Sequence, residues 1–70
     1  MDRVAVKSTE IAIVGYDSRN SKLEITFRRG GVYRYAGVPG NVYDELMNAE
    51  SQGSYFAENI KEKYPFTKVS

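Results

Sequence analysis

Apolar and polar residues alternate along the first half of the chain with the period of β-strands. Residues 11–16 form an apolar, β-branched run that ends at a cluster of turn formers, residues 17–21. From Lys22 to Arg28, apolar and polar residues alternate strictly, which is typical of a strand with one buried face. A glycine pair then marks a turn before a third strand, residues 32–36. The pattern predicts an antiparallel meander, with residues 4–7 as a candidate short edge strand.

Beyond Gly37 the apolar residues take the spacing of helices. The first helix is predicted from an apolar stripe at positions 42, 46 and 49, preceded by Pro39, which suits the first turn. We expect Gly53 to end this helix in the left-handed conformation. Ser54 can then cap a second helix, whose apolar residues 56, 60 and 64 share one face and which ends at Pro65.

Strands followed by helices indicate an α+β fold. We predict an antiparallel three-stranded meander, or four-stranded if one end of the chain adds a strand, followed by two helices packed on one face of the sheet. Residues 65–70 form either a tail or a short edge strand. With 70 residues and an apolar fraction of 41%, the chain is long enough for one core, so we expect a single domain over residues 1–70, with its core at about residues 8–64.

The composition argues against an enzyme. The chain has ten Lys and Arg, nine Asp and Glu, and no His, Cys or Trp. Without His and Cys, the usual catalytic triads, a thiolate nucleophile and a Cys/His zinc site are all excluded, and no acidic run has calcium-loop spacing. Asp17 follows a strand and is interpreted as a turn residue, not a catalytic carboxylate. We therefore expect a binding module with no catalytic residues, no cofactor and no metal.

Nothing in the hydropathy indicates a membrane or an exported protein. The longest apolar stretch, residues 11–14, is far too short to span a bilayer. The first residues lack the charged start, apolar body and cleavage site of a signal peptide. The expectation is a cytoplasmic protein.

Charge is divided unevenly between the two halves of the chain. Residues 1–35 hold seven basic and four acidic side chains (+3), whereas residues 36–70 hold three and five (−2). Arginine beside tyrosine on an exposed sheet is the chemistry of single-stranded RNA recognition, in which rings stack on bases and cations hold phosphates. The candidate RNA-binding residues are Lys22, Arg28, Arg29, Tyr33, Arg34 and Tyr35. The competing interpretation is that these charges only keep the hairpin edges soluble, and a net charge of +1 is far from strongly basic.

The length of the hairpin turn decides which way Tyr33 and Tyr35 face. A two-residue turn would place both tyrosines on the wet face beside Arg28, as a stacking platform. A three-residue turn would place them toward the helices and leave Arg34 outside with Glu24. We favour the second arrangement because it keeps an unpaired arginine out of the core and because three-residue turns with a left-handed Gly are common.

A series of short motifs runs along the chain in a fixed order. Its parts include Val14-Gly15-Tyr16-Asp17, Tyr33-Arg34-Tyr35, Val38-Pro39, Tyr55-Phe56 and Ile60-Lys61. Over about residues 8–64 the series resembles the KTSC family, a small domain found at the C-terminus of some lysyl-tRNA synthetases and as stand-alone bacterial proteins. In that family Asn is common directly after the Tyr-Phe pair, where this chain has Ala57. The resemblance implies a domain of unknown function, for which the synthetase context suggests RNA binding.

Two functions therefore remain as hypotheses. The first is weak, salt-dependent RNA binding through the basic and aromatic hairpin. The second is a protein-interaction module that uses an exposed sheet edge or a helical face, with a second copy of the chain among its candidate partners. It predicts an apolar patch outside the core that includes Tyr55, Tyr64 or Phe66.

Overall fold

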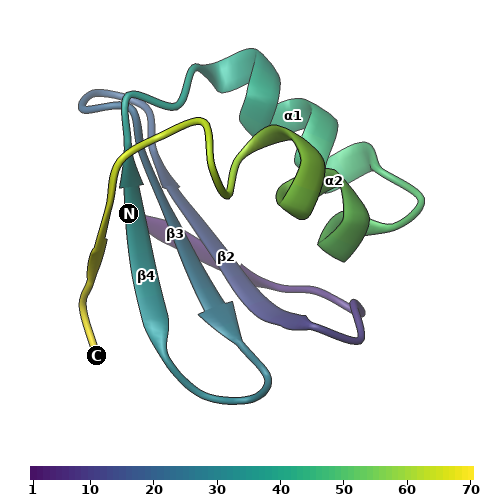
Figure 1. The fold of residues 1–70 in the computed structure, drawn as a ribbon. Helices are drawn as coiled ribbons and strands as arrows, with labels where there is room; N and C mark the ends of the chain where they lie inside the picture. The colour runs from purple at the N-terminus through teal and green to yellow at the C-terminus, as the bar shows by residue number, and fades with distance from the viewer.

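A five-stranded antiparallel sheet carries two helices on one of its faces (Figure 1). The computed structural model describes all residues from 1 to 70. The strands lie in the order of the sequence: β1 (Asp2–Ala5), β2 (Ile11–Asp17), β3 (Lys22–Phe27), β4 (Val32–Ala36) and β5 (Phe66–Lys68). The helices α1 (Gly40–Asn48) and α2 (Gln52–Asn59) connect β4 to β5.

The α+β class and the central meander are confirmed, but the sheet has five strands instead of three or four. Both ends of the chain add a strand. The N-terminal one spans residues 2–5 where we expected 4–7, and residues 66–68 form the short edge strand that was one of the two alternatives for the C-terminal segment. Strands this short lack a long alternating pattern, so the sequence marks them only weakly.

The expected boundary between the two helices is wrong. The first helix already ends at Asn48, because Ala49 is extended, and the second begins at Gln52. Ser51, not Ser54, is the N-cap, and its Oγ accepts a hydrogen bond from the Ser54 N–H at 3.2 Å. Gly53 therefore lies inside α2 and has no left-handed backbone.

The second helix is also shorter than expected. It ends at Asn59, six residues before Pro65, and a turn follows. Ile60 and Lys61 both donate their backbone N–H to the Phe56 carbonyl, which closes the helix. Residues 61–64 therefore belong to the connection to β5, and Pro65 disfavours a helical backbone at Tyr64.

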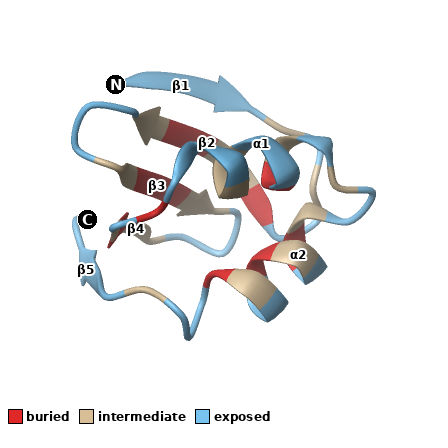
Figure 2. Ribbon diagram, turned by 90° about the horizontal axis from the view of Figure 1, so that it is seen from above, coloured by how far each residue is buried: buried red, intermediate tan, exposed pale blue.

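The core lies between the helices and the β2–β3 part of the sheet. Figure 2 shows the buried segments on these strands and on the helix faces turned toward them. The buried apolar residues are Ile11, Val14, Leu23, Ile25, Tyr35, Val38, Leu46, Phe56 and Ile60. Tyr16 and Tyr43 stack beside this core with ring centroids 4.7 Å apart, and the Tyr16 hydroxyl donates to the Val38 carbonyl.

The hairpin between β3 and β4 has the three-residue turn that we favoured. Phe27 donates its N–H to the Gly31 carbonyl, so residues 28–30 form the turn, and Gly30 has a φ of 110°. Tyr33 then pairs with Ile25, and Tyr35 pairs with Leu23. Both tyrosines therefore stand on the helix side of the sheet, as predicted.

Candidate functional site

The helix side of the sheet is not covered evenly. Both helices lie over β2 and β3, while β5 and the adjoining part of β4 have no helix above them (Figures 1 and 2). A groove of about 630 Å³ opens there, within the size range of sites for small ligands. We call it the aromatic groove; it is lined by Thr9, Glu10, Phe27, Arg29, Gly30, Tyr33, Tyr35, Phe56, Ala57, Lys61 and Phe66.

Five aromatic side chains in this groove form a closed ring. Going round the ring, neighbouring centroids are 5.4 to 5.6 Å apart, and four of the five contacts are edge-to-face. In order, the members are Phe27, Tyr33, Phe66, Tyr35 and Phe56. Such contacts are the preferred geometry of aromatic pairs, and together the five rings give the groove a continuous apolar wall.

The sequence brings the rings together by strand alternation and pairing. Tyr33 and Tyr35 are two residues apart on β4 and so share a face. Phe66 lies opposite Tyr35 because β5 pairs antiparallel with β4. Phe27 comes from the end of β3, and Phe56 comes down from α2.

The ring is accessible to a ligand from its outer side. Phe66 is 56% exposed, and Tyr33 is half-buried. Tyr35 is only 4% exposed, and burial followed by the neighbouring Tyr33 raises the pKa of its hydroxyl. Neither of these two hydroxyls is hydrogen-bonded within the protein, although the hydroxyls of Tyr16 and Tyr55 are. The Tyr35 hydroxyl oxygen is not sealed off from solvent, and Tyr35 is one of the residues that line the groove.

Charged side chains stand at the margins of the groove. Arg29 and Lys61 are exposed cations with no ion pair, since the two salt bridges of the protein both involve Glu24. Glu10 is the one acid among the lining residues, and its carboxylate has no hydrogen-bond partner. The groove therefore combines an apolar aromatic wall with two free cations and one free carboxylate.

The six candidate residues from the sequence do not form one surface. Arg29, Tyr33 and Tyr35 lie together in the aromatic groove. Lys22 and Arg34 stand on the opposite face of the sheet, because they alternate with Leu23 and Tyr35.

Arg28 lies in the hairpin turn and is held by the protein itself. Its Nε donates to the Ser8 carbonyl at 2.6 Å and its Nη2 to the Val6 carbonyl at 2.7 Å. It therefore ties the β1–β2 connection to the hairpin, and its guanidinium is less free to meet a phosphate than that of Arg29.

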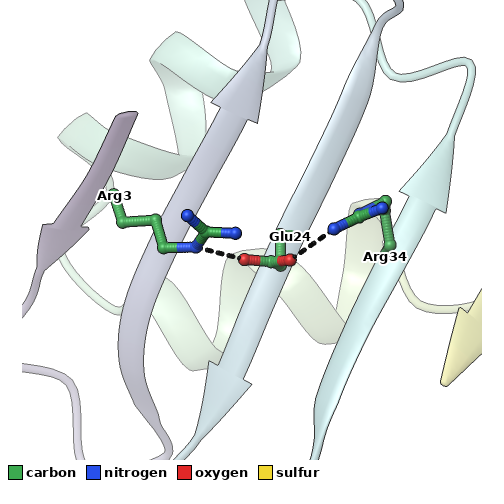
Figure 3. Close-up of polar contacts among 3 residues, drawn as sticks. All are labelled: Arg3, Glu24 and Arg34. Carbon is green, nitrogen blue, oxygen red and sulfur yellow. Dashed lines mark hydrogen bonds and ion pairs between the residues drawn. The ribbon is translucent and has the colours of Figure 1, made fainter. Parts of the chain in front are cut away.

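On the face of the sheet opposite the helices, which we call the far face, Glu24 forms ion pairs with Arg3 on one side and Arg34 on the other (Figure 3). It accepts from Arg3 Nε at 2.6 Å and from Arg34 Nη2 at 2.9 Å, and it is only 4% exposed. The Arg3 hydrogen bond, ahead of that from Arg34, lowers the Glu24 pKa against the opposing effect of burial. Arg3 reaches Glu24 across β2 at Gly15, the residue that pairs with both.

Gly15 leaves the room for this contact. A Cβ at Gly15 would come within 3.2 Å of Arg3 Cγ and 2.9 Å of Met1 Sδ. The row Arg3, Gly15, Glu24, Arg34 is therefore a structural device that neutralises part of the basic charge counted in the sequence.

Two further observations bear on chemistry and location. No group of three or more His, Cys, Asp or Glu residues is arranged to hold a metal ion. Neither helix has the length and apolar character that crossing a membrane requires.

Comparison with known proteins gives the family. A sequence model described as the KTSC domain matches residues 7–64, which is most of the chain. The chain belongs to the KTSC domain family. An uncharacterized protein of Stutzerimonas stutzeri is 38% identical over 64 residues, which cover 91% of this chain and 90% of that protein. A crystal structure of a KTSC domain protein from Yersinia pestis is 40% identical, with a TM-score of 0.96 over 99% of this chain and 97% of that one.

The KTSC domain also occurs within larger proteins. The lysine–tRNA ligase of Nostoc punctiforme is 40% identical over 55 residues, or 79% of this chain. The matched segment is 10% of the ligase, so the chain spans about a tenth of that relative. These comparisons confirm the family resemblance read from the sequence and indicate no catalytic family for the domain itself.

The groove contains five aromatic or charged residues of this KTSC domain that were not among the six candidates. Phe27 and Phe56 have the spacing of core residues, and that is also how they pack. Phe66 could have been found from its partner, since a strand after Pro65 that pairs with β4 places Phe66 beside the tyrosines. Lys61 lies in the connection between α2 and β5, and no pairing in the sequence places it at the groove. Glu10 gives no signal in the sequence.

Proposed function

We propose that this KTSC domain is a non-catalytic module that binds single-stranded RNA in the aromatic groove. The observation that carries the proposal is the closed ring of five aromatic side chains with two unpaired cations at its margin. Bases stack on aromatic rings, and each stacked base contributes about 1–3 kcal/mol. Lysine and arginine at the margin supply the contacts to phosphates.

The placement of the residues supports this assignment more than the sequence pattern did. Arg29, Tyr33 and Tyr35 keep the roles first considered for them, and the groove adds Phe66 and Lys61. We leave Lys22, Arg28 and Arg34 out of the proposed contact surface. Lys22 and Arg34 face the other way, and both arginines are already hydrogen-bonded within the protein.

The relatives add support of a different kind. Some of them are lysine–tRNA ligases, enzymes whose name specifies an RNA substrate. A segment that is one tenth of such an enzyme cannot be assigned its activity, but a role in holding RNA suits a module that occurs both there and in small proteins.

The test is a titration of a fluorescein-labelled single-stranded octaribonucleotide of mixed sequence with the full chain at low salt. With two phosphate contacts, from Arg29 and Lys61, the logarithm of the association constant should fall with the logarithm of salt concentration with a slope of about −1.4. Phe66→Ala should weaken binding by about fivefold or more through the loss of one stacking ring.

Val69→Ala is the matched control, because Val69 is an exposed apolar residue of the same C-terminal segment that does not line the groove. Its affinity should equal that of the wild type. If the wild type does not bind at low salt, or if both variants bind like the wild type, the proposed function is wrong.

One observation favours the second candidate function, strand addition to a partner protein. Bonds from Ala36 to Pro65 and from Val69 to Val32 fix the β4–β5 pairing, so the backbone groups of Phe66 and Lys68 point to the free edge of the sheet. A partner strand could pair there, beside the exposed Phe66 ring.

Sedimentation at rising protein concentration tests the version of this idea in which the partner is a second copy. Thr67→Pro would not discriminate, because the Thr67 N–H points inward to β4 and its loss would disrupt the edge strand itself. N-methylation of the Lys68 amide in a synthetic chain blocks the outer edge alone. Edge pairing predicts a dimer that this N-methylation abolishes; a monomer at all concentrations rules self-pairing out.

A further inference from the structure

Glu10 is the one acid of the aromatic groove. The two oxygens of its carboxylate lie 3.4 Å from the place where a Cβ of Gly53 would be, and the carboxyl carbon lies 3.2 Å from it. Gly53 thus makes room for this carboxylate near the start of α2. The main chain of Glu10 is fixed to the hairpin, because its carbonyl accepts from the Arg28 N–H at 2.9 Å. The Glu10 side chain is exposed and its carboxylate has no hydrogen-bond partner within the protein, so both oxygens have acceptor capacity to offer a ligand.

A second polar group at the groove is available to a ligand. Tyr35 is 4% exposed and lines the groove, and its hydroxyl has no hydrogen-bond partner within the protein although its oxygen is not sealed from solvent. This hydroxyl can therefore donate to a ligand that accepts a hydrogen bond.

The four RNA bases differ in what they can offer to a carboxylate. On its Watson–Crick edge guanine presents two adjacent donors, N1–H and N2–H₂, followed by the acceptor O6. Adenine and cytosine each present one amino donor next to a ring nitrogen that accepts, and this nitrogen repels a carboxylate. Uracil presents one N–H between two carbonyls. Only guanine can therefore donate to both oxygens of one carboxylate.

We propose that the aromatic groove selects guanine, with Glu10 accepting hydrogen bonds from N1–H and N2–H₂ of a base stacked against the ring of aromatic residues. The Tyr35 hydroxyl is the groove's donor to the base, and Arg29 and Lys61 meet the phosphates on either side. This inference rests on the proposed RNA binding, and it adds the identity of the preferred base and the residue that reads it.

The experiment compares four heptaribonucleotides, UUUGUUU, UUUAUUU, UUUCUUU and UUUUUUU, titrated against the full chain at low salt. The wild type should bind the guanine oligonucleotide about fivefold or more tightly than each of the others, the discrimination of one bidentate contact. Glu10→Gln should abolish this preference, because an amide offers one acceptor and one donor and can therefore pair with an adjacent donor and acceptor on each of the four bases.

Glu62→Gln is the matched control, because it makes the same change of charge at an exposed residue outside the groove. It should raise affinity for all four oligonucleotides slightly and equally, and it should keep the guanine preference. Gly53→Ala is a second variant that reaches Glu10 without changing it, since the new methyl group would displace the carboxylate. It should reduce the guanine preference, and thermal melts of every variant show whether the fold is retained.

The outcomes separate the two proposals. Equal binding of all four oligonucleotides by the wild type, together with weaker binding by Phe66→Ala, would overturn base selection and leave RNA binding standing. A guanine preference that persists in Glu10→Gln would overturn the role of Glu10. Binding of no oligonucleotide would overturn the proposed function itself.

Discussion

Replacing Glu24 by Gln should destabilise the KTSC domain, because the Glu24 carboxylate neutralises Arg3 and Arg34 on the face of the sheet opposite the helices. The carboxylate accepts two charge-assisted hydrogen bonds, from Arg3 and Arg34. A glutamine keeps one acceptor oxygen and turns an amide N–H₂ donor toward an arginine donor. One hydrogen bond is lost, and two donors are left facing each other at a residue that is only 4% exposed.

The expected loss of stability depends on two facts: the Glu24 carboxylate is buried, and its two arginine partners are partly exposed. A hydrogen bond to a charged group is worth about 1.5–3 kcal/mol when it is buried. Both arginine side chains are about half exposed, so solvent screens the interaction, and we expect Glu24→Gln to lower the free energy of unfolding by about 1–2 kcal/mol. For a chain of this size, that corresponds to a melting temperature lower by about 5–15 °C.

The effect should also depend on pH with a definite sign. The pKa of Glu24 is lowered in the folded protein, chiefly by the hydrogen bond from Arg3, so folding favours the charged form. The stability that this gives is present above the pKa of Glu in the unfolded chain and is lost as the pH falls through the lower folded pKa. Asp17 behaves likewise, because the hydrogen bond from the Asn20 side chain lowers its pKa.

Urea unfolding of both proteins, followed by circular dichroism from pH 7 to pH 2.5, measures the difference. The wild type should have the larger free energy of unfolding at pH 7, and its difference from Glu24→Gln should become smaller toward pH 2.5. The variant should still lose stability in acid, partly because Asp17 becomes protonated. Gly15→Ala should lower stability at pH 7 and weaken the same pH dependence, since its Cβ would displace the Arg3 side chain. A Glu24→Gln variant within about 0.3 kcal/mol of the wild type at pH 7 would refute the reasoning.

Three other predictions follow from contacts elsewhere. Arg28→Ala should lower the free energy of unfolding by about 1 kcal/mol and speed amide exchange near Val6, because two hydrogen bonds to carbonyls are lost. The control Arg29→Ala should leave the urea midpoint unchanged and should weaken RNA binding instead. Ser51→Ala should cost about 1 kcal/mol in the same assay through loss of the α2 cap, so an unchanged midpoint would contradict the assigned helix start. Gly53→Ala should melt no lower than the wild type, because alanine favours the helix and the exposed end of Glu10 can move aside.

The sequence was sufficient where a local pattern has one physical solution. The alternation from Lys22 to Arg28 and the turn formers beside it predicted the central strands, and Asp17 accepts from the backbone of Arg19 and Asn20 as a turn residue should. The cost of burying Arg34 selected the three-residue hairpin turn, which the register of β3 and β4 confirms. Each of these inferences needed only the nearest neighbours in the chain or across one strand pair.

The sequence was insufficient where two local solutions are nearly equal. Ser51 and Ser54 are both good N-caps, and only the extended backbone at Ala49 decides between them. The role of Gly15 was hidden for a related reason, because Arg3 lies two strands away from Glu24 and their contact depends on the pairing of three strands.

The aromatic groove shows the limit of reasoning from strand parity. The hairpin argument places Tyr33 and Tyr35 toward the helices, on the face of the sheet that carries the core. The structure confirms the direction, but the helices are short and lie over β2 and β3, so the same face is core at one end and open groove at the other. Whether a side chain that faces inward is covered depends on the length and placement of the covering element, which the alternation of a single strand does not contain.

The distribution of charge has to be read in the same three-dimensional way. Four basic residues against Glu24 alone made the hairpin segment, residues 22–35, look like a basic surface. In the structure Glu24 holds Arg34 as well as Arg3, and backbone carbonyls hold Arg28, so two of these four cations already have partners. The cations that remain free at the groove are Arg29, from the basic half of the chain, and Lys61, from the acidic half. A binding face is therefore better judged by which cations lack intramolecular partners and where they lie than by net charge along the sequence, and the two such cations at the aromatic groove, Arg29 and Lys61, are the ones that the proposed RNA binding uses.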